Sequence, residues 1–325
     1  MAQKISDQTP PLPGIIATLT TGFEFTTRHV WLTIIPIGLD IFYWLGPRMN
    51  ITGIVSEVTA LLADEPAYSG LAEEILAMAP RINLFTYLSV PVVGVPALMG
   101  GTIPENTPIK PISFELIDFQ SWLLILIALT LLGFGLTTIY LSLISRVLKS
   151  EEGYEFPGIL DFTGLTLLAI FRLVGLAVAF VITLFLLTLP LLPIAFIMGL
   201  INSALMFGVL LFAFLIVAAY LSLAVPGIIY NNRPIFKAIM ESIRLVYGNM
   251  LPTINILLVV ILIINGTNLL WLLADNGSWL TLVSIIGHAF ISTGLAVAII
   301  IFYRDRYLLL INSNSTPVQE EFPND

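Results

Sequence analysis

Residues 121–145, SWLLILIALTLLGFGLTTIYLSLIS, form a charge-free apolar run that decides the fold class of this chain. A helix needs roughly 20 apolar residues to cross the ~30 Å hydrocarbon core of a bilayer, and this run is longer than that. Four further runs of similar character predict spans at residues 173–200, 203–229, 253–273 and 279–303. Residues 30–45 are a shorter, sixth candidate. The sequence therefore predicts an all-α, polytopic membrane helix bundle with six transmembrane spans.

The composition agrees with a membrane protein. The chain is 58% hydrophobic and 10% charged, whereas a soluble domain has about 25% charged residues. The net charge of −8 comes from acidic residues in the connections and tails, which argues against a nucleic-acid partner. Because the sequence has no cysteine, it predicts no disulfide framework, no thiolate metal site and no cysteine nucleophile. The lipid bilayer is the first partner that we expect.

The distribution of Lys and Arg predicts the orientation of the spans, because cytoplasmic segments are enriched in these residues. With both termini inside, the cytoplasmic side holds ten of them, namely Lys4, Arg28, Arg146, Lys149, Arg172, Arg233, Lys237, Arg244, Arg304 and Arg306. Three lie outside, namely Arg48, Arg81 and Lys110. We therefore expect a multi-pass protein of a prokaryotic cell (plasma) membrane with both termini in the cytoplasm.

Residues 82–99 offer an alternative topology, because they are also free of charge. A seventh span there, with the N-terminus outside, gives the same ten-to-three distribution of Lys and Arg. Pro91, Gly94 and Pro96 interrupt the segment, and a broken helix leaves backbone groups unpaired in lipid. We therefore favour six spans with residues 82–99 as a surface segment, although the charge rule itself does not separate the two topologies.

On the six-span topology, residues 47–120 form an outward-facing amphipathic helical insertion between the first two spans. Apolar residues recur with helical spacing over residues 51–62 and again over residues 68–79, and the turn at residues 64–66 separates these two predicted helices. Their apolar faces need cover. The simplest interpretation is a helical cap on the outer ends of the spans, and the alternative is a docking site for another membrane protein.

The chain thus divides into five segments. Residues 1–27 are a cytoplasmic N-terminal segment without the apolar core of a cleaved signal peptide, and residues 28–46 contain the first span. The outward insertion at 47–120 and a five-span membrane core at 121–310 follow. Residues 311–325 are polar and acidic, so we expect a disordered cytoplasmic tail.

The segment between the fourth and fifth spans is the most specific local pattern in the chain. Asn232 is predicted to be the N-cap of an amphipathic helix with Pro234 in its first turn, and Gly248 is predicted to end it in a left-handed conformation. Arg233, Lys237, Glu241 and Arg244 fall on one stripe of that helix. We expect an elbow between two spans. Arg233, Lys237 and Arg244 face lipid headgroups if the elbow lies in the membrane interface, and a purely structural elbow is the alternative.

This elbow carries a resemblance to a known family. Its pattern is an apolar helix end at Pro226, a polar turn, and then a helix with Ala238, Ser242, Leu245 and Gly248 at characteristic positions. In these residues the segment 222–252 resembles the glycerophosphodiester phosphodiesterase membrane-domain family and its stand-alone integral membrane relatives of unknown function. The segment 22–25, Gly-Phe-Glu-Phe, agrees with the same family. The resemblance implies a membrane fold and carries over no catalytic residue, because the soluble barrel fused to some members is absent.

Three polar residues are predicted to lie near the middle of the membrane. At ~1.5 Å of rise per residue, Asp40 in the first span, Asn265 in the fifth and His288 in the sixth reach similar depths. A carboxylate in hydrocarbon costs at least ~2.5 kcal/mol, so Asp40 is expected to face the bundle and to find a donor in His288 or Asn265. A hydrogen-bonded clamp, a proton or ligand relay, and an Asp40 that simply reaches the outer interface all agree with the pattern.

The sequence contains no recognisable catalytic motif. It has no Gly-rich phosphate loop and no Gly-x-Ser-x-Gly elbow, and its two histidines are His29 and His288, so we predict no enzymatic activity, no metal and no cofactor. Glu151, Glu152 and Glu155 are interpreted as solvated loop residues. The leading hypothesis is a non-catalytic scaffold or accessory subunit of a membrane assembly. The alternatives are a transporter-like or permease-like protein with a mid-membrane polar site, and a lipid-handling protein that uses the elbow.

Overall fold

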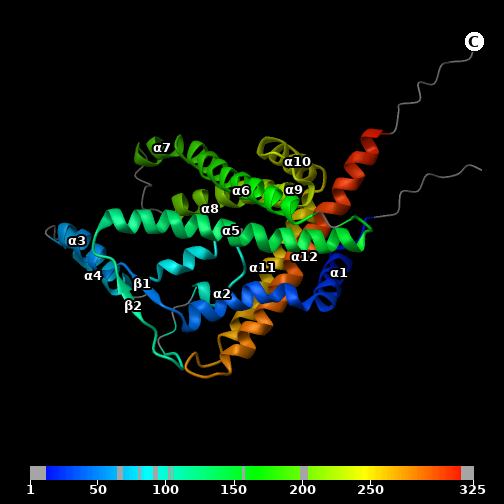
Figure 1. The fold of residues 1–325 in the computed structure, drawn as a ribbon. Coiled ribbons are helices and arrows are strands. Elements are labelled where there is room, and N and C mark those ends of the chain that lie inside the picture. The colour runs from blue at the N-terminus through cyan, green and yellow to red at the C-terminus, as the bar shows by residue number, and fades with distance from the viewer. Residues whose placement is uncertain are drawn as a thin grey trace, which may run out of the picture.

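The computed structural model describes residues 12–63, 69–79, 82–90, 94–101, 104, 106–155, 158–197 and 204–315. Within them, five apolar helical segments are long enough to cross a membrane. They are α5 (Phe119–Glu151), α6 (Ile159–Thr188), α8 (Ala204–Leu221) continued by α9 (Ala224–Asn231), α11 (Met250–Trp271) and α12 (Thr281–Ser315) (Figure 1). Each contains most of one predicted run. The chain is therefore an all-α, multi-pass membrane protein.

Helix α12 is the central span of the bundle. In its most apolar stretch 67% of the residues are buried inside the protein, against 11% to 28% for the other four spans. Helix α1 (Ile15–Arg28) packs along it, and no helix had been assigned to this N-terminal segment from the sequence. The two helices meet at glycines, since a Cβ atom on Gly22 would lie 2.6 Å from the carbonyl oxygen of Gly294.

The sixth candidate span is shorter than the other five. Residues Val30–Leu45 form the 3₁₀ turn η1 (Val30–Thr33) followed by α2 (Ile34–Leu45). Helix α2 contacts α12, and Leu39, Tyr43 and Trp44 are buried. The segment thus belongs to the packed bundle.

Helix α6 begins earlier than the predicted run, which started at residue 173. Its first residue is Ile159, so Arg172 lies inside the helix instead of in a connection. The Nη1 atom of Arg172 donates to the carbonyl oxygen of Asn232 at 2.8 Å and also to the Asn232 side chain. A hydropathy pattern ends at a charged residue, whereas the backbone hydrogen bonds of a helix do not depend on the charge of the side chain.

The acidic residues after α5 have specific partners, so their interpretation as merely solvated residues was wrong for two of them. Glu151 pairs with Arg28 of α1 at 2.9 Å. Glu152 pairs with Arg304 of α12 at 2.5 Å and accepts a hydrogen bond from the Tyr230 hydroxyl at 2.8 Å. The ends of α5, α9 and α12 and the helix α1 therefore meet at one end of the molecule, which we call the terminus-bearing end (Figure 1).

The opposite end carries the segment that was predicted as an insertion. Helices α3 (Thr52–Ala63) and α4 (Ser69–Met78) confirm the two helices expected there, and they pack on each other. Beside them, β1 (Arg48–Asn50) and β2 (Ser113–Glu115) form a parallel pair with Arg48 opposite Ser113 (Figure 1). This pair closes the base of the insertion.

The described residues 82–90 and 94–101 fold into the bundle, whereas residues 82–99 were predicted as a surface segment. Their described part contains the short 3₁₀ turns η3 (Leu84–Leu88) and η4 (Met99–Gly101) and no helix of membrane-spanning length. A Cβ atom on Gly133, near the middle of α5, would lie 2.7 Å from the carbonyl oxygen of Tyr87. This inward-folded segment therefore reaches the mid-length of a spanning helix. Non-helical backbone is tolerated at such depth where protein covers it, and α2 and α5 provide the cover.

The remaining helices are α7 (Leu191–Ile197) and the elbow helix α10 (Ile235–Gly248). Two details of the elbow differ from prediction. Pro234, not Asn232, occupies the N-cap position of α10, and Asn232 ends α9 with a left-handed φ of 53°. Gly248 is the last helical residue and has no left-handed φ.

Helix α12 also continues to Ser315, within the predicted tail, and residues 316–325 lie outside the described residues.

Candidate functional site

Asp40 is the buried acid around which the inward-folded segment is arranged. The residue is 0% exposed in α2. One carboxylate oxygen accepts the backbone N–H of Leu98 at 3.0 Å, and the other accepts the backbone N–H of Met99 at 2.7 Å. An unpaired N–H group is costly in a buried position. The Asp40 carboxylate therefore pairs the backbone donors at the start of η4.

The structure gives Asp40 partners other than those predicted. Asn265 is exposed on α11, and its amide donates to the carbonyl oxygen of Ile261 at 2.8 Å. His288 is buried in α12, and its Nε2 atom has no hydrogen-bond partner among the described residues. Within the described part of the chain, no hydrogen bond joins Asp40 to either residue. Equal depth along three helices does not determine which face each side chain occupies.

Other polar side chains fix the inward-folded segment to its surroundings. The Asn83 side chain accepts from the backbone N–H of Met49 at 3.1 Å and of Phe85 at 3.3 Å, so it links β1 to η3. The Tyr43 hydroxyl donates to the carbonyl oxygen of Thr86 at 3.4 Å. Sequence reasoning missed this arrangement. The available signal was a Pro- and Gly-rich, charge-free segment close to an acidic residue in an apolar span.

The basic residues of the elbow have different surroundings. Lys237 and Arg244 are exposed. Arg233 is not free to face headgroups as predicted, because its Nε atom lies 3.2 Å from the Glu241 carboxylate and its Nη2 donates to the Tyr307 hydroxyl of α12. Arg233 therefore ties the start of α10 to the central span, and two of the three predicted headgroup-facing residues stay available.

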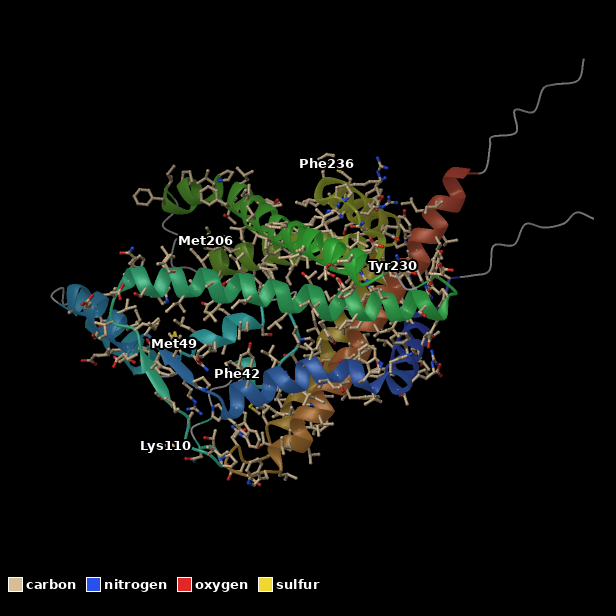
Figure 2. All side chains as sticks on the ribbon, viewed as in Figure 1. Phe42, Met49, Lys110, Met206, Tyr230 and Phe236 are labelled. Carbon is tan, nitrogen blue, oxygen red and sulfur yellow. The ribbon has the colours of Figure 1, made fainter. Side chains whose placement is uncertain are left out.

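The exposed face of α10 is also apolar. Phe236 and Tyr247 are both 78% exposed, and Met240 and Ile243 lie between them on the same side. Figure 2 shows Phe236 at the edge of the molecule. The opposite face is packed, and the Ser242 hydroxyl there donates to the carbonyl oxygen of Tyr220 at 2.6 Å. The elbow helix is thus amphipathic, with an outward face that is both apolar and basic.

Comparison of the chain with protein-family models, with curated proteins and with solved structures finds no match. The resemblance of residues 222–252 to a membrane-domain family therefore stays a prediction. Of its pattern residues, Pro226, Ala238, Ser242 and Leu245 are buried, so the pattern describes the packing of the elbow. In the described residues, no group of three or more His, Asp or Glu side chains is arranged to hold a metal ion.

Proposed function

We propose that the chain is a non-catalytic integral membrane protein that acts as a scaffold or accessory subunit of a membrane assembly. In this proposal Val30–Leu45 is the first of six spans, and the terminus-bearing end lies in the cytoplasm of a prokaryotic cell. The ten-to-three distribution of Lys and Arg supports this orientation. The insertion then faces outward, where a partner can reach it.

The hairpin of α3 and α4 is the observation that carries the proposal. Its two helices pack on each other, yet Val58 is 51% exposed and Met78 is 59% exposed. Ile75 and Leu76 add to this exposed apolar surface. Apolar surface that the fold leaves uncovered outside the spans is typical of interaction sites. We infer that the outer part of a neighbouring membrane protein covers the hairpin.

The mid-membrane residues support a structural use of the bundle. A transport or relay site needs an acid that is free to exchange a proton or contact a ligand. Both oxygens of Asp40 are engaged by backbone donors, and Asn265 is bonded to its own helix. These contacts favour the scaffold over the transporter.

Photo-crosslinking in intact cells tests the scaffold directly. A photoreactive amino acid at Val58 or Met78 should yield the same discrete protein adduct, because both positions lie on the hairpin surface. The matched control is Val181, which is 63% exposed on the apolar span α6 and should react with lipid. Lipid-only adducts at all three positions would contradict the proposal.

A lipid-handling protein is the second candidate, and the outward face of α10 favours it. Basic residues beside exposed aromatic residues are typical of helices that lie among headgroups. Lys237 and Arg244 should each contribute on the order of 1 kcal/mol of attraction to anionic lipid. In nanodiscs of mixed lipid, the variant K237Q/R244Q should lose enrichment of anionic lipid around the protein. An unchanged enrichment would argue against this candidate.

A further inference from the structure

A pocket of about 270 Å³ lies between α5, α6 and α9 at the terminus-bearing end, and its lining combines apolar residues with a group of polar ones. Four of its lining residues come from the last turns of α5, and they are Ser142, Ser145, Arg146 and Lys149. Their spacing of three and four residues places them on one face of the helix. Tyr230 and Asn232 line the pocket from the other side, and Figure 2 labels Tyr230 at this end of the molecule.

The two cations in the pocket are oriented by aromatic rings. The Arg146 guanidinium lies over the ring of Phe162, 3.7 Å from its centroid, and the Lys149 ammonium lies 4.6 Å from the centroid of Tyr230. Neither cation forms an ion pair with any described residue. A ring contact of this kind holds a cation without using its hydrogen-bond donors. Both positive charges are therefore held in place and remain available to an anion.

Buried donors in the pocket lack partners. Ser145 is 2% exposed, and its hydroxyl has no hydrogen-bond partner among the described residues. The Nη1 atom of Arg146 is likewise buried and unpartnered in the same part of the chain. Leaving such groups unpaired is unfavourable. Both residues line the pocket, so a rotation of either side chain toward the cavity would let an acceptor oxygen of a ligand satisfy the group.

The rim of the pocket opposite α5 is held in position by contacts that do not involve Ser145 or Arg146. Asn232 adopts a left-handed φ of 53°, and Arg172 of α6 bonds both its carbonyl oxygen and its side chain. The arrangement of the rim is therefore present before any ligand binds. A lining that is already fixed reduces the ordering cost of binding.

We propose that this pocket binds the phosphate group of a phospholipid headgroup or of a small soluble phosphate ester. A guanidinium, an ammonium and a hydroxyl group are the donors that phosphate oxygens accept most readily. The volume admits a phosphate and a small alcohol, while the acyl chains of a lipid would lie outside in the bilayer. This is a discrete site inside the bundle, separate from the outward face of α10 and from the hairpin.

Glu155 provides a test of the sign of the ligand's charge. Its carboxylate also lines the pocket, so it repels an anion that Arg146 and Lys149 attract. Removing the acid should strengthen phosphate binding, and removing the bases should weaken it. A site for a cation would respond in the opposite way.

The experiment uses the whole protein in nanodiscs that contain phosphatidylglycerol and phosphatidylcholine, with native mass spectrometry of retained lipid. Calorimetric titration with glycerol phosphate and with inorganic phosphate measures soluble ligands in parallel. The wild type should bind one phosphate-containing ligand per chain. R146Q/K149Q should bind at least about tenfold more weakly, and S145A about threefold more weakly. E155Q should bind more tightly, while K110Q, which removes an exposed lysine that does not line the pocket, keeps the wild-type affinity.

Each outcome of these experiments either supports or overturns the phosphate site. A retained lipid that glycerol phosphate displaces supports the headgroup source, and phosphate binding without retained lipid supports the soluble source. Absence of binding to the wild type, or equal affinity in wild type, R146Q/K149Q and E155Q, would overturn the proposal. If R146Q/K149Q fails to fold, S145A and the exposed-site variant E155Q still give the answer. Crosslinking at the hairpin is unaffected by these variants, so the scaffold proposal succeeds or fails separately.

Discussion

Asp40 acts on the main chain of a distant segment, and its replacement tests that role. In D40N the amide oxygen can accept one N–H group, but the amide nitrogen is a donor and faces the other N–H group of Leu98 or Met99. One unpaired buried donor costs about 1–3 kcal/mol, so we expect D40N to lose about 2 kcal/mol of unfolding free energy and D40L about twice that.

Unfolding in detergent measures both D40N and D40L. The matched control is N265L, which lies at similar predicted depth but is exposed on α11, and its stability should stay within about 0.5 kcal/mol of wild type. Wild-type stability in D40N would show that the Asp40 contacts do not hold the segment.

The charged residues of the elbow should differ in their effects because they face different surroundings. R233Q removes the cation beside Glu241, whose side chain is 12% exposed, and the bond to Tyr307. Breaking a buried pair is strongly destabilising. Since the Arg233 side chain is itself 26% exposed, solvent compensates in part, and we expect a loss of about 1–3 kcal/mol.

K237Q and R244Q serve as controls for R233Q in the same unfolding experiment. Both residues are exposed on α10, so each change should stay within about 0.5 kcal/mol. Equal effects of all three substitutions would mean that Arg233 does not connect α10 to α12.

At the scale of elements, the inward-folded segment depends on a glycine of the helix beside it. A Cβ atom on Gly133 would lie 2.7 Å from the carbonyl oxygen of Tyr87 and 2.8 Å from that of Leu88. These are backbone atoms, which cannot move aside as a side-chain end can. We expect G133A to displace η3 from α5 and to cost about 1–3 kcal/mol.

Gly208 on α8 is the matched control for Gly133, because a Cβ atom there meets nothing within 4 Å. Alanine is the better helix former, so G208A should be neutral or slightly stabilising. Hydrogen exchange of residues 84–90 should rise in G133A and not in G208A. Equal protection in the two variants would remove the argument for close backbone approach.

At the scale of the whole molecule, the two ends of the bundle should lie on opposite sides of the membrane. The chain has no cysteine, so single cysteines report their own exposure to an impermeant thiol reagent. Cysteines at Ser56 on α3 and at Gly277 between α11 and α12 should label in intact cells. Cysteines at Ser150 and Ser313 should label after permeabilisation. Protection at Ser56 with labelling at Gly277 would favour the seven-span topology.

The sequence by itself determined the elements whose signal is local. The length of the apolar runs predicted the five long spans, and helical periodicity predicted α3 and α4. Both signals are properties of one continuous segment, namely the length of its apolar run and the spacing of its apolar residues. These elements could therefore be predicted without knowing which other segments pack against them.

Tertiary structure alone decided how distant segments meet. It paired Asp40 with the backbone of Leu98 and Met99 and directed Arg233 toward α12. It also continued α6 through Arg172, whose partner Asn232 follows α9. It also brought Ser145 and Arg146 of α5 together with Asn232 in one pocket. The physical reason is that depth and periodicity give a residue's position along its own helix, whereas its partner depends on which helix faces it and on close approaches at residues such as Gly133.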